Sequence, residues 1–228
     1  MMQFLRELRF LMSIPKRDFL YISKVRLIWT VRPYTMLLYA RLSALYEAAR
    51  RLEKEGIEGS FVECGVWNGG SAGVVAAVAK ERHIWLFDSW KGLPEPSIYD
   101  ISLRGQPGQK GMALGSEEKA RELLFEKLKL NDGTIHLVRG WFSDSLPARK
   151  NEVGQIALLH LDCDWYESVK LCLEELYDRV VAGGWIFIDD YGHWRGCKKA
   201  VDEFIETRNL GVELVRIDYT GVCFRTDA

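Results

Sequence analysis

The chain has 228 residues, of which 48% are hydrophobic, and its formal net charge is −1. This length and composition suit one sizeable globular domain and exclude a disordered or fibrous protein. The near-neutral charge argues against a nucleic-acid partner, because a domain that neutralises many phosphates is usually strongly basic.

The cysteines and the N-terminus bear on the cellular compartment. The five cysteines are scattered, without a CxxC pair or a zinc spacing: Cys64, Cys163, Cys172, Cys197 and Cys223. Such a set favours reduced thiols in the cytoplasm over a disulfide framework. The N-terminus has neither a long apolar run nor a small-residue cleavage site, so the sequence predicts neither secretion nor a transmembrane span. We therefore expect a cytoplasmic protein.

Residues 1–34 read as an N-terminal arm that precedes a single domain, residues 35–228. The arm carries seven Lys or Arg residues against two acids, mixed with apolar and aromatic side chains. Two hypotheses fit this composition: packing on the body or on a second subunit, and contact with a membrane or an anionic substrate. From Thr35 the apolar spacing predicts a helix, which Gly56 ends. Its apolar face consists of Leu38, Leu42, Leu45, Ala49 and Leu52.

Beyond this helix the chain alternates between short apolar runs and helical patterns. The runs predict strands at residues 60–64, 83–87, 134–138, 155–161 and 184–188, with two closing strands at 212–217 and 221–225. The helical patterns fall at residues 72–80, after Ser116, at 168–181 and at 197–207. Strands that alternate with helices and end in a hairpin predict a doubly wound α/β sheet.

A glycine-rich turn, residues 65–71, follows the first strand. Glycines let the backbone approach a ligand closely, and the N-terminus of the next helix offers free N–H groups. Asp88 ends the second strand, 25 residues after Glu63 (88 − 63). An acid at that place is the usual partner of a ribose diol, so the turn and the acid together predict a nucleotide-like cofactor.

Four acids follow two further strands: Asp162 and Asp164 after one, and Asp189 and Asp190 after the other. If the strands are parallel, these carboxylates converge at one edge of the sheet. Two unit charges about 4 Å apart repel by roughly 4 kcal/mol at an effective dielectric near 20, so the cluster needs protons or a cation. We favour a cation, although each acid alone would also suit a helix cap or a loop. The spacing does not tell the roles of Asp162 and Asp164 apart.

Residues 90–115 contain five glycines and three prolines and lack an apolar period. Long loops of this kind within compact domains are usually lids or disordered segments. We expect a lid that gates the substrate.

The sequence resembles the macrocin O-methyltransferase (TylF-like) family of class I S-adenosylmethionine-dependent methyltransferases from about residue 35 to 224. Four ordered stretches carry the resemblance: FVECGVWNGGS at 61–71, FDSWKGLP at 87–94, HLDCDWYES at 160–168 and GGWIFIDDYG at 183–192. It implies a Rossmann-like, seven-stranded, mostly parallel sheet with a terminal antiparallel strand and helices on both faces. It also implies methylation of a hydroxyl, with a sugar on a natural product or a polysaccharide as the acceptor, by a homo-oligomer.

The resemblance further implies roles for individual residues. Glu63, Gly65 and Ser71 would line the methionine end of S-adenosylmethionine, Asp88 would hold the ribose, and Ser89, Trp141 and Phe142 would surround the adenine. Asp162, Asp189 and Asp190 would bind a divalent metal, and Asp164 would act as the general base. An all-carboxylate site favours Mg²⁺ over zinc.

Two other functions remain open at this point. Tyr166 and Lys170 form a Y-x-x-x-K match that, with the glycine turn, is typical of an NAD(P)-dependent short-chain dehydrogenase; the flanking acids argue against it. A cofactor-binding partner subunit without catalytic activity is the other, but an inactive site has no need for four clustered acids.

Overall fold

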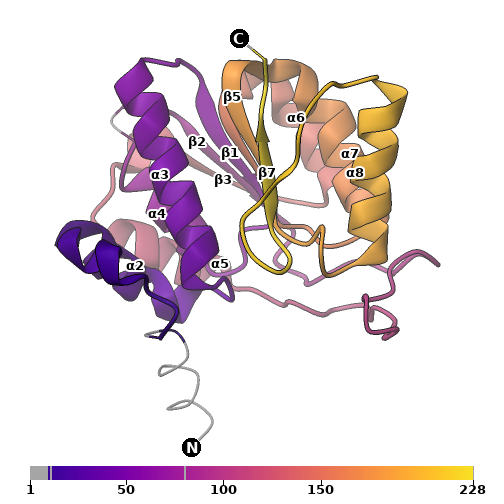
Figure 1. The fold of residues 1–228 in the computed structure, drawn as a ribbon, viewed down its shortest axis with the longest axis horizontal. Helices are drawn as coiled ribbons and strands as arrows, with labels where there is room; N and C mark the ends of the chain where they lie inside the picture. Colours follow the sequence, from indigo (N-terminus) through magenta and orange to yellow (C-terminus); the bar gives the residue numbers. More distant parts are fainter. Residues whose placement is uncertain (1–9, 11, 80, 228) are drawn as a thin grey trace, which may run out of the picture.

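The fold was analysed in a computed structural model, which describes residues 10, 12–79 and 81–227. Its centre is a seven-stranded sheet in the order β3-β2-β1-β4-β5-β7-β6 (Figure 1). Strands β1 to β5 are parallel, and β7 runs antiparallel to both of its neighbours. The predicted mostly parallel sheet is therefore confirmed. The strands are β1 (Ser60–Cys64), β2 (Ile84–Asp88), β3 (Ile135–Arg139), β4 (Ile156–Leu161), β5 (Val180–Ile188), β6 (Val215–Arg216) and β7 (Val222–Arg225).

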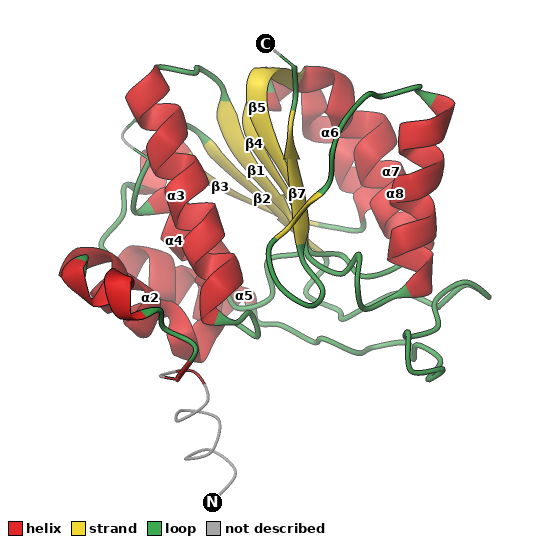
Figure 2. Cartoon of the chain, viewed as in Figure 1, coloured by secondary structure: helices red, strands yellow, loops and turns green. Residues whose placement is uncertain are grey.

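Helices cover both faces of the sheet (Figure 2). On one side lie α2 (Ile22–Val31), α3 (Tyr39–Glu55), α4 (Gly70–Ala76) and α5 (Glu117–Arg121), which continues into the π-helical turn η3 (Glu122–Lys127). On the other side lie α6 (Phe142–Val153), α7 (Tyr166–Leu176) and α8 (Arg195–Thr207). Four 3₁₀ turns complete the described elements: η1 (Lys16–Leu20), η2 (Arg32–Tyr34), η4 (Asp132–Thr134) and η5 (Tyr177–Arg179).

The two helix layers enclose two cores, and successive strand residues alternate between them. In β4, Leu158 packs into the core beneath α3, whereas Leu159 and Leu161 pack into the core beneath α7 and α8. Because side chains alternate across a strand, a run that is apolar at every position can only be buried on both faces. This is why the uninterrupted apolar runs predicted the strands correctly.

Most element ends follow from local chemistry. Gly56 takes the left-handed conformation (φ 67°) that ends α3, as its sequence position predicted. Ser116 caps α5 by accepting a hydrogen bond from the N–H of Lys119. The helix predicted at residues 168–181 is shorter, because β5 begins at Val180 and extends well before the predicted residue 184.

The structure corrects the prediction for two segments: the strand predicted at residues 212–217 is only two residues long, Val215–Arg216, and one helix was not predicted. Between β3 and β4 the sequence analysis predicted no helix, yet α6 lies there. Its helical pattern is weak because Pro147 lies inside the helix and only Ser145, Leu146 and Val153 are buried. In the N-terminal arm, α2 packs one face on the body through Ile28 and Val31. Residues 1–9 and 11 of the arm lie outside the described part of the chain.

Within the described residues, no helix combines the length and the apolar character that crossing a bilayer requires.

Candidate functional site

A cavity of about 270 Å³ opens at the carboxyl ends of β1, β2 and β4. Its walls include seven residues that the sequence analysis singled out: Gly65, Asp88, Ser89, Trp141, Phe142, Asp162 and Asp164. These residues come from four separate segments of the chain. Parallel strands bring their carboxyl ends to one edge of the sheet, which is where ligands of open α/β sheets bind.

Residue 65 must be glycine because the carboxyl ends of β1 and β4 approach each other closely. Gly65 has φ 96°, and a Cβ atom at this position would lie 1.8 Å from the carbonyl oxygen of Asp162. The N–H of Asp162 in turn donates to the carbonyl of Cys64 at 2.9 Å. The glycine motif and the first acidic motif are therefore in direct backbone contact.

Asp88 organises the rim of the cavity. One of its carboxylate oxygens accepts the N–H groups of Val66 and Trp67, both at 2.8 Å, and the other accepts the N–H of Trp90 at 2.7 Å. Trp67 and Trp90 both have positive φ (53° and 48°), a strained conformation for such residues. Asp88 thus holds two strained turns in place, and its predicted bond to a ribose remains a prediction.

Glu63 and Ser71 lie behind the cavity wall instead of on it. The Ser71 hydroxyl donates to Oε1 of Glu63, and Nδ1 of His160 lies 3.3 Å from the same oxygen. Burial alone would lower the pKa of His160, but its bonds to Asp189 and Glu63 raise it to about 10. Oε2 of Glu63 is buried and has no hydrogen-bond partner in the described part of the chain. This orphaned acceptor suits a cationic group such as the ammonium of a methionine.

The four acids after β4 and β5 fall into two overlapping groups that share Asp162, and the predicted metal set Asp162, Asp189 and Asp190 is not itself a group among the described residues. Asp162, Asp164 and Asp190 present ligand atoms within 4.8 Å of one another, as do His160, Asp162 and Asp189. Burial raises the pKa of Asp162 and of Asp190, and neighbouring carboxylates raise both further. Burial also raises the pKa of Asp164, to about 6. A cluster of hard oxygen atoms in which charge is this costly fits a divalent cation.

Arg41 is a functional candidate that the sequence analysis missed. It lies on α3, its guanidinium binds Asp189, and its Nε is 3.0 Å from Asp218. Burial would lower the pKa of Arg41, but Asp189 and Asp218 raise it overall. One signal was available: Arg41 falls on the apolar stripe of its helix, four residues before the buried Leu45.

Asp164 is oriented by two features of its own. Its backbone is left-handed (φ 60°), a conformation that Asp tolerates better than most residues. Its Oδ1 accepts a hydrogen bond from the indole N–H of Trp194 at 2.8 Å. The second carboxylate oxygen is left to meet a ligand or a proton.

The loop at residues 90–115, described throughout, forms isolated bridges but no regular strand or helix. Asp100 anchors its middle: its side chain is buried and accepts the N–H of Tyr166, the first residue of α7, at 2.8 Å. Ser102 forms a bridge with Trp194. The loop is thus fastened to the two segments that orient Asp164, while Leu93 and Ala113 line the cavity.

The Y-x-x-x-K match does not form a dehydrogenase site. The Tyr166 hydroxyl donates to Glu203 of α8 at 2.7 Å, and this bond is the main cause that raises its pKa to about 12. A dehydrogenase needs the opposite, a tyrosine that releases its proton readily. The structure therefore argues against this alternative.

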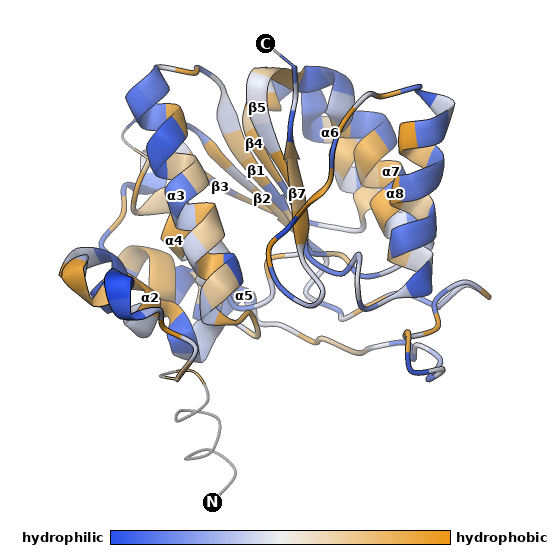
Figure 3. Ribbon diagram, viewed as in Figure 1, coloured by the Kyte–Doolittle hydropathy of each residue, from blue (hydrophilic) through white to orange (hydrophobic). Residues whose placement is uncertain are grey.

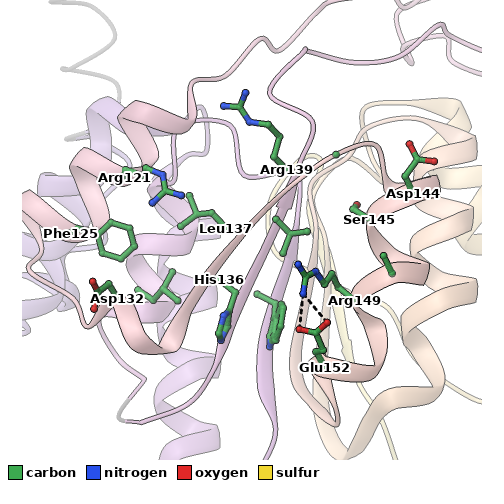
Figure 4. Close-up of a pocket in the computed structure, with 15 residues that line it drawn as sticks. Arg121, Phe125, Asp132, His136, Leu137, Arg139, Asp144, Ser145, Arg149 and Glu152 are labelled. Carbon is green, nitrogen blue, oxygen red and sulfur yellow. Dashed lines mark hydrogen bonds and ion pairs between the residues drawn. The ribbon is translucent and has the colours of Figure 1, made fainter.

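A larger cavity of about 860 Å³ runs along the free edge of β3 (Figure 4). Its arginines are already ion-paired: Arg149 with Glu152 at 2.8 Å, Arg139 with Glu117 at 2.7 Å and Arg121 with Glu117 at 2.9 Å. Of the predicted site residues, none lines this groove in the described chain. We therefore place the site in the smaller cavity.

Comparisons with known proteins identify related sequences and a related solved structure. The sequence profile described as "Macrocin-O-methyltransferase (TylF)" matches residues 24–226. The chain is 32% identical to demethyldecarbamoylnovobiocin O-methyltransferase of Streptomyces niveus over 207 residues, covering 85% of this chain and 76% of that enzyme. It is also 32% identical to a tetracenomycin-C 4'-O-methyltransferase of Streptomyces olivaceus, covering 88% and 78% of the two chains. The solved structure of the O-methyltransferase NovP superposes with a TM-score of 0.73 at 31% identity, covering 86% of this chain and 83% of that chain.

Proposed function

Because the chain belongs to the macrocin O-methyltransferase (TylF) family and is an O-methyltransferase, we propose that it transfers a methyl group from S-adenosylmethionine to a sugar hydroxyl. The acceptor is a natural product or a polysaccharide. A divalent metal assists the transfer. The relatives are named for methylation of novobiocin and rhamnosyl-tetracenomycin precursors, which supports an acceptor of this class. The observation that carries the proposal is the convergence of three carboxylates, Asp162, Asp164 and Asp190, at the cavity that Asp162 and Asp164 line.

In this proposal the cofactor lies along the ends of β1 and β2. The orphaned oxygen of Glu63 attracts the ammonium of its methionine part, with Gly65 and Ser71 shaping the turn around it. Asp88 faces the ribose, and the cavity wall formed by Ser89, Trp141 and Phe142 receives the adenine. Stacking on an aromatic wall suits a purine ring.

The acids bind the cation that orients the reacting hydroxyl of the acceptor. We assign Asp162, Asp189 and Asp190 to a divalent cation, preferably Mg²⁺. Asp189 would share its carboxylate with the cation: its Oδ2 is engaged by Arg41, and its Oδ1 lies 4.0 Å from Nε2 of His160, in the group that also contains Asp162. When bound, the cation supplies a Lewis acid that orients neighbouring hydroxyls and lowers the pKa of one of them.

The acceptor oxygen then loses its proton and gains the methyl group. The free oxygen of Asp164 takes the hydroxyl proton, while Trp194 fixes the carboxylate. The acceptor oxygen, held about 3 Å from the methyl carbon, forms the new C–O bond as the C–S bond breaks. The sulfonium becomes the neutral thioether of S-adenosylhomocysteine. Loss of charge from sulfur is favoured in a dry site, which gives the anchored loop a function as a lid.

A panel of vicinal-diol sugars and phenols, incubated with S-adenosylmethionine with and without EDTA, tests the proposal. We expect methylated product that depends on added Mg²⁺ and is lost in EDTA. Turnover that continues undiminished without divalent metal would contradict the assignment of the acids. Binding of NADH but not S-adenosylmethionine in a thermal-shift assay would overturn the choice of cofactor.

A further inference from the structure

Residues 12–30 expose a cluster of large apolar side chains that is separate from the candidate site. We call this cluster the α2 surface; it consists of Met12 (77% exposed), Phe19 (54%), Leu20 (84%), Tyr21 (53%), Ile22 (75%) and Trp29 (45%). Soluble monomers rarely leave large apolar patches open to water, and those that they leave open commonly mark a binding surface.

The opposite face of α2 fixes this surface rigidly on the body. Ile28 and Val31 are fully buried in the core. Lys24 is also buried, and its ammonium binds Asp18 at 3.2 Å and Glu47 of α3 at 2.9 Å. The outward residues Ile22, Arg26 and Trp29 follow the i, i+4, i+7 spacing of one helix face. Ile22 and Trp29 are therefore exposed on a docked helix, whereas Phe19 and Leu20 lie in η1, which Asp18 ties to Lys24 and Tyr39.

The exposed charges of this segment are all positive. Among residues 12–30 they are Lys16, Arg17 and Arg26, whereas the one acid, Asp18, is 6% exposed and bonded to Lys24 and to Tyr39. Apolar and aromatic side chains combined with Lys and Arg match an anionic lipid surface, where headgroups meet the cations and the apolar groups enter the interface. Glu47 of α3, whose side chain is 54% exposed, is bonded to Lys24 and adds one acid at the border of this segment.

The shape of the α2 surface also suits a fluid partner. Four consecutive residues, 19–22, are exposed at the bend between η1 and α2, so their side chains project in several directions. A rigid partner would need a recess of matching shape, whereas a bilayer interface deforms around such a protrusion. Figure 3 shows hydrophobic and hydrophilic residues side by side on α2, as expected of a helix that lies in an interface.

We propose that the α2 surface docks this protein peripherally on an anionic membrane. Leu20 and Ile22 enter the boundary between headgroups and acyl chains, and Lys16, Arg17 and Arg26 lie among the headgroups. Figure 1 places α2 at the same end of the sheet as the loop that borders the cavity, so docking turns that end toward the bilayer. The interaction is one of surface contact and is independent of the proposed reaction.

Flotation with vesicles tests this proposal without any activity measurement. We expect the purified full chain to float with vesicles of phosphatidylcholine and phosphatidylglycerol, to bind vesicles of phosphatidylcholine alone far more weakly, and to be released by salt. Each Lys or Arg near an anionic surface contributes about 1 kcal/mol, so Arg17→Gln should weaken partitioning about five-fold. Leu20→Ser with Ile22→Ser should weaken it by at least about ten-fold, because two apolar side chains leave the interface.

Matched controls keep the outcome decisive. Val215→Ser removes an apolar side chain that is 53% exposed on β6, outside the α2 surface, and should leave flotation unchanged. Absence of flotation with anionic vesicles at low salt would overturn the proposal. So would light scattering that shows a dimer which Leu20→Ser with Ile22→Ser dissociates, because the α2 surface would then join two copies of the chain.

Discussion

Replacing Arg41 by Gln tests how the charge of the acidic cluster is balanced. The guanidinium binds Asp189 and lies 3.0 Å from Asp218, and these three side chains are at most 11% exposed. Removing one partner of a buried ion pair costs about 3–5 kcal/mol, because the remaining charge stays buried without compensation. We expect a loss of that size in EDTA; at about 2–4 °C per kcal/mol for a chain of this length, Tm falls by roughly 10 °C.

Added Mg²⁺ should return part of this stability. A ligand that binds only the folded state at about 100 times its Kd stabilises it by about 2.7 kcal/mol. In the native chain the charge of Arg41 opposes an incoming cation, so the rise in Tm with Mg²⁺ should be larger for Arg41→Gln than for the native chain. Calorimetric unfolding in EDTA and across a Mg²⁺ titration measures both effects.

The matched control is Arg82→Gln. Arg82 is ion-paired with Glu53, both side chains are 13% exposed, and the pair lies outside the acidic cluster. This variant should lose stability but respond to Mg²⁺ as the native chain does. An equal Mg²⁺ response in the two variants would refute the coupling of Arg41 to a metal site. An unchanged Tm of Arg41→Gln in EDTA would refute the reasoning from buried charge.

Three further predictions concern the cavity. Asp164→Asn should abolish turnover yet leave S-adenosylmethionine affinity within a few-fold by calorimetric titration; a large loss of affinity would instead place Asp164 in the cofactor site. Asp100→Ala removes the side chain that caps α7, so denaturant unfolding should show a loss of about 0.5–2 kcal/mol, and an unaltered midpoint would count against the cap. Gly65→Ala should cost more than about 4 kcal/mol because its Cβ meets a carbonyl at 1.8 Å. Gly111→Ala, at φ 80° with open space around it, should lose only about 1–3 kcal/mol from backbone strain, and equal losses in thermal unfolding would refute the steric argument.

The parts of the fold that the sequence predicted are those that local chemistry determines. The strands were visible because burial on both faces leaves a mostly apolar run, as in β2 and β4. Gly56 marked the end of α3 by its left-handed conformation, and Ser116 marked the start of α5 by its side-chain oxygen. Both effects act within one turn of the helix. The convergence of the four acids followed from topology alone, since parallel strands share one carboxyl edge.

The parts that the sequence did not predict depend on contacts between distant residues. Arg41 lies 148 positions before Asp189, and nothing in its neighbours along the chain indicates an acidic partner. Asp100 lies in a loop without periodicity and acts as the cap of a helix 66 positions away. Neither contact leaves a local pattern. Helix α6 was missed for another reason: its stability comes from packing on the sheet, while Pro147 and a narrow buried face weaken its own signal.

The proposed roles of the acids are supported by the partners of each side chain, which spacing cannot supply. Asp162 and Asp164 are equivalent in the motif, yet Asp162 continues β4, whereas Asp164 turns left-handed and receives the indole N–H of Trp194. Asp189 is held by the cationic Arg41. A neutral donor fixes the orientation of Asp164 without compensating its charge, whereas Asp189 faces a cation. For that reason we assign the proton transfer to Asp164, and to Asp189 the charge balance with Arg41 in addition to its proposed place in the metal site. We expect Asp189→Asn, unlike Asp164→Asn, to lower Tm by leaving Arg41 with Asp218 alone.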